Sequence, residues 1–273
     1  MEESRPIYQW VGLTTPGRLP ESGLDDVNFA ISRGERIAFV GPQFHGRSQV
    51  IRILGGTRPH FYGKFFFYGF EVPTFDIAPK WEDPLPKNLR RKVGACYEKD
   101  GLLSNVSVRE GLETLFRFKY GDHNAGLIEG SRRVVRNIAE ELGLDSKVLD
   151  SRPAQLNSAQ ARVAALARVF LTKPPVIVLE NPTDNLGPIE WGRVAAALET
   201  ILADPQRVLL LSTGDWSLAY RFCTRWIYVD SGKVQFDGSP QEFMKSNFPI
   251  VSEMKHAQER RIVEHQTLWR WAI

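Results

Sequence analysis

Four short apolar runs, each bounded by polar or turn-forming residues, constrain the fold of this chain more than any other feature of its sequence. They are residues 36–40, 175–179, 208–211 and 226–229. Continuous runs of β-branched and large aliphatic side chains are typical of strands that are buried on both faces, as in a parallel sheet. Helix-like stretches separate these runs, at residues 48–54, 134–142, 159–171 and 189–202. Strands that alternate with helices predict an α/β fold.

Three regions depart from this alternation. Residues 55–75 are rich in glycine and aromatic side chains, and 65–70 within them indicate a short hairpin-like insert. Residues 106–150 read as largely helical, and the turn-forming Asp-Ser-Arg-Pro run at 150–153 separates them from the next helix. The tail from 252 to 273 is highly charged up to a Leu-Trp-Arg-Trp run, and we expect it to form an appended helix.

Length and composition exclude several classes of protein. A chain of 273 residues with 42% hydrophobic and 25% charged residues has the composition of an ordinary globular protein, so disorder and fibre are excluded. The length allows one large or two small domains, and we expect one multi-lobed domain. The net charge of +3 is too small to indicate a nucleic-acid or membrane partner by itself.

The cysteines and the apolar pattern bear on the compartment. Cys96 and Cys223 lie far apart in apolar contexts, which predicts neither a disulfide framework nor a four-ligand metal site and fits a reducing compartment. The five histidines show no metal-ligand spacing. No signal-like run follows the charged N-terminus and no 18 apolar residues occur in a row, so we expect a chain that neither spans a membrane nor is exported.

A loop that could hold a phosphate follows the first apolar run. Residues 41–48 read Gly-Pro-Gln-Phe-His-Gly-Arg-Ser, which matches G-x-x-x-x-G-K-S except that Arg47 replaces lysine. Glycines let successive backbone N–H groups curl around an anion, and the following helix adds its positive end. Ser48 would supply a hydroxyl to Mg²⁺. Taken alone, the loop could equally be a tight turn between a strand and a helix.

Two further motifs follow in a fixed order. Leu-Asn-Ser-Ala-Gln at 156–160 precedes a helix of small residues, and the apolar run that ends at 179 leads into Glu-Asn-Pro-Thr-Asp-Asn-Leu-Gly-Pro at 180–188. Together with the phosphate loop, this order resembles the nucleotide-binding domain of ATP-binding cassette (ABC) transporters over residues 7 to about 245. That family has a phosphate loop, a Q-loop, a Leu-Ser-Gly-Gly-Gln signature, a strand ending in Asp-Glu, a D-loop and a switch histidine.

The resemblance implies a fold and a set of binding residues. The implied fold is an α/β P-loop NTPase core with a mostly parallel sheet, an antiparallel β-subdomain and a helical lobe, plus a C-terminal helical extension. We expect the domain over 1–248, with the lobe at about 104–168, and the extension over 249–273. Ser48 and Glu180 are the expected ligands of Mg²⁺. The residues expected to bind nucleotide are Gly41, Gly46, Arg47, Ser48, Gln49, Asn157, Ser158, Ala159 and Gln160.

Most chemical positions of the family pattern are altered. Glu98 replaces the Q-loop glutamine, Asn181 replaces the glutamate that follows the strand, and Gly214 replaces the switch histidine. Glu180 replaces an aspartate and can still hold Mg²⁺ through water. Asn181 cannot accept a proton from an attacking water, a loss that typically costs about 10²–10⁴ in rate. We therefore expect no intact catalytic residue and hydrolysis near zero.

The altered residues affect nucleotide binding less directly than they affect catalysis. Arg47 keeps a positive charge on a wider, planar head, and Phe44 replaces a glycine of the family's loop. In the signature, Asn157, Ser158 and Ala159 replace Ser-Gly-Gly. We expect ATP and Mg²⁺ to bind weakly or not at all. The competing interpretation is neutral drift in a working ATPase motor.

The segment after the Q-loop indicates a partner. In the family this region receives the coupling helix of the membrane subunit, and Gly-Leu-Leu-Ser-Asn at 101–105 followed by Val-x-Val is similar to ATPase subunits of Mla/Mce-type lipid-trafficking complexes. We expect an integral-membrane partner that docks at the Q-loop region, a homodimer or a heterodimer with another ABC subunit, and a peripheral position on the cytoplasmic face of the inner membrane. A cassette that acts on ribosomes or DNA is disfavoured by the single cassette and the low charge, so no nucleic-acid partner is expected.

Overall fold

The computed structural model describes residues 5–16, 22–56, 61–73, 87–98, 102–120 and 125–253. The strands are β1 Tyr8–Thr15, β2 Leu24–Ile31, β3 Arg36–Val40, β4 Tyr62–Phe67, β5 Phe70–Glu71, β6 Val93–Cys96, β7 Val176–Glu180, β8 Val208–Ser212, β9 Arg225–Asp230 and β10 Lys233–Gly238. The α-helices are α1 Arg47–Leu54, α2 Lys87–Arg90, α3 Val108–Tyr120, α4 Ala125–Leu142, α5 Ser146–Asp150, α6 Ser158–Thr172, α7 Pro188–Ile201, α8 Trp216–Phe222 and α9 Pro240–Lys245.

The central sheet has the order β10-β9-β3-β8-β7-β6. All its neighbouring pairs are parallel except β10 with β9. The four apolar runs of the sequence form β3, β7, β8 and β9, which confirms the predicted parallel sheet. Because β3 lies between β8 and β9, the loop that follows it opens at the centre of the sheet's carboxyl edge, the usual ligand position in open α/β sheets.

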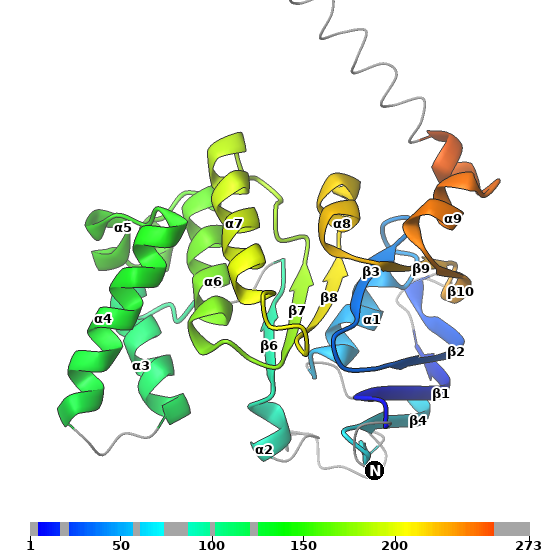
Figure 1. The fold of residues 1–273 in the computed structure, drawn as a ribbon, viewed down its shortest axis with the longest axis horizontal. Coiled ribbons are helices and arrows are strands. Elements are labelled where there is room, and N and C mark those ends of the chain that lie inside the picture. The colour runs from blue at the N-terminus through cyan, green and yellow to red at the C-terminus, as the bar shows by residue number, and fades with distance from the viewer. Residues whose placement is uncertain are drawn as a thin grey trace, which may run out of the picture.

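A second, antiparallel sheet has the order β2-β1-β4-β5. The predicted hairpin-like insert is the β4–β5 hairpin, in which Phe67 pairs with Phe70. This sheet packs over α1, which is enclosed between the two sheets (Figure 1). Tyr8 on β1 donates its hydroxyl to the carbonyl of Leu54 at 2.9 Å and so ties the C-terminal end of α1 to the antiparallel sheet.

Alternate side chains of the central strands enter two separate cores. Phe39 and Val178 face α1 and the antiparallel sheet. Val40 and Leu179 face the layer of helices on the other side of the sheet. Strands that are apolar on both faces are expected when both faces are covered, which explains why their sequences show no alternation.

The helical lobe comprises α3, α4, α5 and α6 and lies at the β6 end of the sheet (Figure 1). Asp145 caps α5 by accepting the N–H of Val148 at 2.8 Å. The α4 helix begins at Ala125, nine residues before the predicted stretch of 134–142. The α6 helix is shared between the lobe and the sheet, since its side chains pack against β6 as well as α3 and α4.

The last described residues of the chain pack against the core. Phe243 on α9 stacks among Trp216, Trp226 and Tyr228, and Val251 is buried in the same cluster. The predicted amphipathic tail falls on residues 254–273, which lie outside the described residues, so the C-terminal extension stays a prediction. None of the described helices is long and apolar enough to cross a membrane.

Gly41→Ala should destabilise the fold. Gly41 has φ 146°, and a Cβ there would lie 2.1 Å from the carbonyl oxygen of Val229. This oxygen is a backbone atom and cannot move aside without a shift of the chain. We expect strain alone to lower the free energy of unfolding by about 1–3 kcal/mol. Urea denaturation measures this loss. Gly130→Ala is the matched control, because a Cβ at this site in α4 meets nothing within 4 Å. Equal stability of both variants would contradict the prediction.

Candidate functional site

The loop between β3 and α1 forms the floor of the candidate site. Gly46 has φ 99°, and a Cβ there would approach the Gly23 carbonyl to 2.9 Å. The N–H groups of Gly46, Arg47 and Ser48 find no hydrogen-bond acceptor within the part of the chain that the structure describes. Unpaired N–H groups at the positive end of a helix attract an anion, so the loop keeps the geometry of a phosphate cradle.

Phe44 stands at the apex of this loop in the left-handed region, with φ 68°. Its side chain is 75% exposed. A non-glycine residue in this region is strained. The aromatic ring therefore projects into solvent beside the cradle and does not pack into the core.

Arg47, the first residue of α1, is almost completely buried. Its Nη1 donates to the carbonyl of Gly41 at 3.0 Å and to the carbonyl of Thr213 at 3.2 Å. Burial lowers the pKa of Arg47, and the nearby carboxylates of Glu180, Asp184 and Glu98 oppose that shift. The guanidinium thus joins the phosphate loop to the end of β8 and is held by backbone carbonyls.

Glu180 ends β7 and is 1% exposed. One carboxylate oxygen, Oε2, lies 3.4 Å from Nη2 of Arg52 and accepts the N–H of Glu98 at 3.4 Å. The other oxygen, Oε1, is buried and has no hydrogen-bond partner among the described residues. Because a buried anionic oxygen without a partner is costly, a cation beside Oε1 would remove that cost.

Asn181 occupies the next position, in the left-handed region with φ 45°. Its N–H donates to the Ser212 carbonyl at 2.7 Å, which fixes the backbone against β8. Its side-chain Nδ2 lies 3.5 Å from Oε2 of Glu98, at the limit of a hydrogen bond. Two positions that the sequence predicted to be chemically altered, 98 and 181, therefore contact one another.

The turn after β8 is organised by Asp215 and leaves Gly214 exposed. Asp215 Oδ2 accepts from Trp191 Nε1 at 2.8 Å and from the Thr183 hydroxyl at 3.2 Å, while Oδ1 caps α8 through the N–H of Leu218 at 3.2 Å. Burial alone would raise the pKa of Asp215, but these hydrogen bonds outweigh it and lower the pKa. A Cβ at Gly214 would meet no atom within 4 Å, so this position has room for a larger side chain.

The signature residues lie at the start of α6 on the helical lobe. Asn157 Oδ1 accepts the N–H of Gln160 at 2.9 Å, and Gln160 Oε1 accepts the N–H of Asn157 at 3.1 Å. This reciprocal capping box uses both side chains and two of the N–H groups that a ligand would otherwise contact. Ser158 and Ala159 begin the helix between them. No hydrogen bond within the described residues joins this segment to the phosphate loop of the same chain.

Gln49 is placed differently from the other residues of the predicted binding set. Its Oε1 accepts the Thr15 hydroxyl at 2.9 Å, and its Nε2 donates to the Ser22 carbonyl. The side chain therefore ties α1 to the end of β1 and to the segment before β2. Gln49 contributes to the site through the packing of α1.

Two buried or half-buried arginines at the site were not predicted. Arg52 on α1 pairs with Glu180. Arg162 on α6 donates to the carbonyls of Tyr97 at 2.9 Å and Glu98 at 2.7 Å. The sequence signal for Arg162 was its spacing, because it follows the signature by one helical turn and therefore lies on α6 near that segment. No local pattern identifies the partner of either arginine, because both partners are distant in sequence.

Comparisons with known proteins agree with this geometry. A family model described as "ABC transporter" matches residues 24–184, more than half of the chain. The chain belongs to the ABC transporter family. It is 30% identical over 212 residues to the ABC transporter ATP-binding protein YbbA of Escherichia coli, covering 78% of this chain and 88% of that protein. A putative ABC transporter ATP-binding protein of Methanosarcina mazei is 27% identical, over 90% of this chain and 70% of that protein.

A solved structure shares the fold of this ABC transporter protein. It is an ATP-binding cassette in a dimeric, post-hydrolysis state with ADP and Pi, with a TM-score of 0.72 and 22% identity over 85% of this chain and 98% of that chain. The resemblance confirms the predicted P-loop NTPase fold. ABC cassettes bind ATP with Mg²⁺, work as dimers and pair with membrane subunits, so the chain is the ATP-binding subunit type of a membrane transporter.

Asp215→Asn should destabilise the protein in a pH-dependent manner. Because the pKa of Asp215 is lowered in the folded state, its carboxylate stabilises the fold at neutral pH, and this contribution is lost as pH falls through the folded pKa, below 3.8. We expect a loss of about 1–2 kcal/mol at pH 7 from the cap and its hydrogen bonds, which shrinks toward pH 3. Urea denaturation at both pH values measures it. Glu141→Gln on the exposed face of α4 is the control, and a pH-independent difference would contradict the prediction.

Proposed function

We propose that this ABC cassette is a subunit with degraded ATP sites and a mainly structural or regulatory role in its transporter. The observation that carries the proposal is Asn181, whose amide replaces the proton acceptor and lies against Glu98. An amide cannot take a proton from water, and Gly214 offers no side chain to the γ-phosphate. Phosphoryl transfer depends on positioning and charge stabilisation, so these losses compound.

The residues that remain could still hold a nucleotide. The N–H groups of Gly46, Arg47 and Ser48 would receive phosphate oxygens, and the Ser48 hydroxyl and the unpaired Oε1 of Glu180 suit Mg²⁺. When bound, Mg²⁺ neutralises phosphate charge and fixes the orientation of the chain of phosphates. The orphaned oxygen of Glu180 is the feature of this site that best fits a bound cation.

The protein's own arginines oppose this binding. A triphosphate in the cradle would have to share Arg47 with the Gly41 and Thr213 carbonyls, and Mg²⁺ at Glu180 would lie near the Arg52 guanidinium. We therefore infer weak binding of ATP and Mg²⁺. The alternative, an active ATPase motor, is favoured by one observation, the retained carboxylate of Glu180 at the end of β7.

The remaining assignments concern partners. Asn157 and Ser158 at the start of α6 are exposed, so a second cassette, either a copy of this chain or a different ABC subunit, could contact them. Hydrolysis would then come from the other subunit where it is needed. An integral-membrane partner would hold the chain peripherally on the cytoplasmic face of the inner membrane. We also propose domain limits of 1–248 and 249–273, with the helical lobe at about 104–168.

The segment after the Q-loop supports docking of that partner and a role in lipid trafficking. Residues 102–107 lead into α3, and Leu103 is 59% exposed. An exposed leucine next to a junction between lobes is suited to contact another protein. The likeness of this segment to Mla/Mce-type ATPase subunits supports a lipid as the transported class.

ATP turnover separates the two proposed roles. We expect the purified chain to hydrolyse ATP no faster than its Arg47→Ala variant. Asn181→Glu should raise turnover, up to the roughly 10²–10⁴-fold that a general base supplies, and Gly214→His has room to add to it. Phosphate release measures the rate. A wild-type rate well above Arg47→Ala that disappears in Glu180→Gln would establish the active motor and overturn the proposal.

Nucleotide affinity tests the inferred role of Arg47. Arg47→Lys should bind ATP more tightly than the wild type. The compact ammonium of lysine cannot donate to the Gly41 and Thr213 carbonyls with the planar geometry of a guanidinium, so it stays available to phosphate. We expect at least a tenfold lower Kd by calorimetry, with and without Mg²⁺. Arg133→Lys on the exposed face of α4 is the control. Weaker binding by Arg47→Lys than by the wild type would show that the guanidinium itself holds phosphate.

A further inference from the structure

The turn between β9 and β10 contacts the loop that forms the phosphate cradle. Asp230 pairs with Lys233 across the two strands, so Ser231 and Gly232 form a two-residue turn. Both have positive φ, 51° and 76°, as the type I′ turn of a tight hairpin requires. The N–H of Gly232 donates to the carbonyl of His45 at 3.2 Å. The hairpin therefore holds a backbone carbonyl of the phosphate loop.

The hairpin turn is itself fixed from its other side. Asp25 on β2 donates its N–H to the Gly232 carbonyl at 2.9 Å. A Cβ at Gly232 would lie 2.6 Å from the carbonyl oxygen of Gly23, so the turn packs directly on the backbone before β2. Because backbone atoms fix the turn, the Gly232 N–H is held in one place relative to the loop.

The side chain of His45 binds the same hairpin. Its Nδ1 lies 2.6 Å from Oδ1 of Asp230, which also accepts the hydroxyls of Tyr228 at 2.9 Å and Ser231 at 3.1 Å on its two oxygens. Burial alone would raise the pKa of Asp230, but hydrogen bonds from His45 and the two hydroxyls lower it. A carboxylate oxygen only accepts, so Nδ1 of His45 carries the proton of this bond.

These contacts set the direction of the peptide group between His45 and Gly46. In a trans peptide the C=O and N–H bonds point in opposite directions, and no cis peptide occurs among the described residues. The His45 carbonyl faces the Gly232 N–H, so the Gly46 N–H faces away from the hairpin. This N–H is one of the cradle donors that have no acceptor within the described part of the chain. The hairpin therefore keeps it available to an anion.

This peptide group depends on an outside contact more than the next one does. The Gly46 carbonyl accepts the N–H groups of Gln49 at 2.9 Å and Val50 at 3.1 Å, so α1 fixes the peptide between residues 46 and 47. The peptide before it lies outside the hydrogen bonds of the helix. Glycine tolerates either sign of φ, so Gly46 offers little resistance to a reversal of that peptide. A reversed peptide would turn the His45 carbonyl toward the anion and repel it.

We propose that His45 and Asp230 form a latch that positions the phosphate loop, by keeping the His45 carbonyl on the hairpin and the Gly46 N–H toward a bound phosphate. His45 is a positioning residue in this role, because it acts through the backbone. The two side chains are 29% and 32% exposed, and such an ion pair contributes little to global stability. The proposal rests on the proposed nucleotide binding for its effect on affinity, but not for its effect on the loop.

Amide NMR of the nucleotide-free full chain tests the effect on the loop. Labelling with ¹³C-carbonyl histidine and ¹⁵N-glycine selects the Gly46 amide, because His45 and Gly46 form the only His-Gly pair of the sequence. We expect Asp230→Ala to shift the Gly46 peak by more than its linewidth. Asp25→Ala is the matched control, since it makes the same change on an exposed carboxylate that pairs with Lys233 instead. An unmoved peak in Asp230→Ala, or equal shifts in both variants, overturns the proposal.

Calorimetry with ATP supplies the second measurement. Loss of a carboxylate beside an anion site should strengthen binding by charge alone, whereas loss of the latch should weaken it. We expect Asp230→Ala and His45→Ala each to raise the Kd at least fivefold, and the double variant to bind no worse than either. His45→Asn should stay within twofold of the wild type, because the asparagine Nδ2 takes the place of Nδ1 as a donor to Asp230.

The outcomes separate the latch from the charge and from the proposed function. Tighter binding by Asp230→Ala overturns the latch, and so does a loss in His45→Asn as large as that in His45→Ala. An unmoved Gly46 peak in a chain that binds ATP overturns the latch and leaves nucleotide binding standing. No binding of ATP by the wild type overturns both the role of the latch and the inferred nucleotide binding.

Discussion

The turn from β3 into α1 is the constraint on which the rest of the site depends. At Gly41 the space of a Cβ is taken by the Val229 carbonyl, and at Gly46 it is taken by the Gly23 carbonyl. The turn is therefore fixed by backbone atoms of β9 and of the segment before β2, and Arg47 adds a hydrogen bond to the Gly41 carbonyl. The apolar side chains of α1 are also buried between the two sheets, which fixes the helix that follows the loop. This explains how a phosphate-binding geometry persists beside altered catalytic positions.

The charges of the site are largely balanced within the chain. Glu180 pairs with Arg52, while Arg47 and Arg162 are held by carbonyls at the ends of the neighbouring strands. Asp184 shows the limit of this balance: burial and Glu98 raise its pKa, and Arg162 and Arg47 lower it. Only Oε2 of Glu180 faces an arginine, so its buried Oε1 still lacks a partner that a cation could supply.

Sequence patterns predicted the parts of the fold that depend on local composition. The strands β3, β7, β8 and β9 were predicted because burial on both faces leaves an uninterrupted apolar run. The pairing of β1 with β2 was not predicted from the residues themselves, since charged Asp25 and Asp26 interrupt the pattern and the register shifts along the pair. At the site, the altered positions 98, 181 and 214 were recognised by their order in the chain. The bonds of Arg47 to Thr213 and of Arg162 to Tyr97 span 166 and 65 residues, and no local rule reaches that far.

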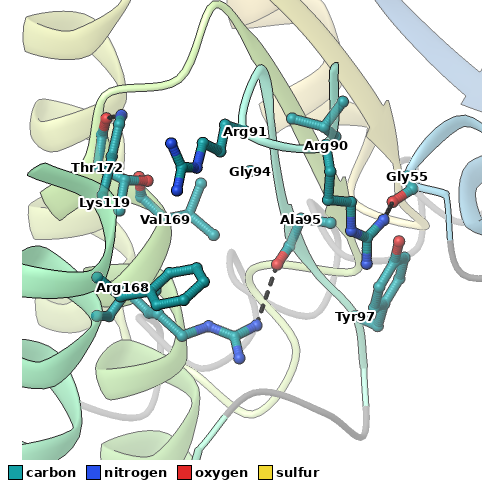
Figure 2. A pocket seen from close by; sticks show the side chains of 13 residues that line it. Gly55, Arg90, Arg91, Gly94, Ala95, Tyr97, Lys119, Arg168, Val169 and Thr172 are labelled. Carbon is teal, nitrogen blue, oxygen red and sulfur yellow. Dashed lines mark hydrogen bonds between the residues drawn. The ribbon is translucent and has the colours of Figure 1, made fainter. Parts of the chain in front are cut away.

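The helix α6 connects the signature segment of the helical lobe with the strand β6 of the central sheet. Its first residues form the capped signature, Arg162 donates to the carbonyls of Tyr97 and Glu98, and Arg168 donates to the carbonyl of Ala95 (Figure 2). Two arginines on one helix thus hold β6 and the two residues that follow it. Because packed helices and strands move as rigid bodies, a shift of α6 would carry Arg162 with it and displace the backbone at Glu98.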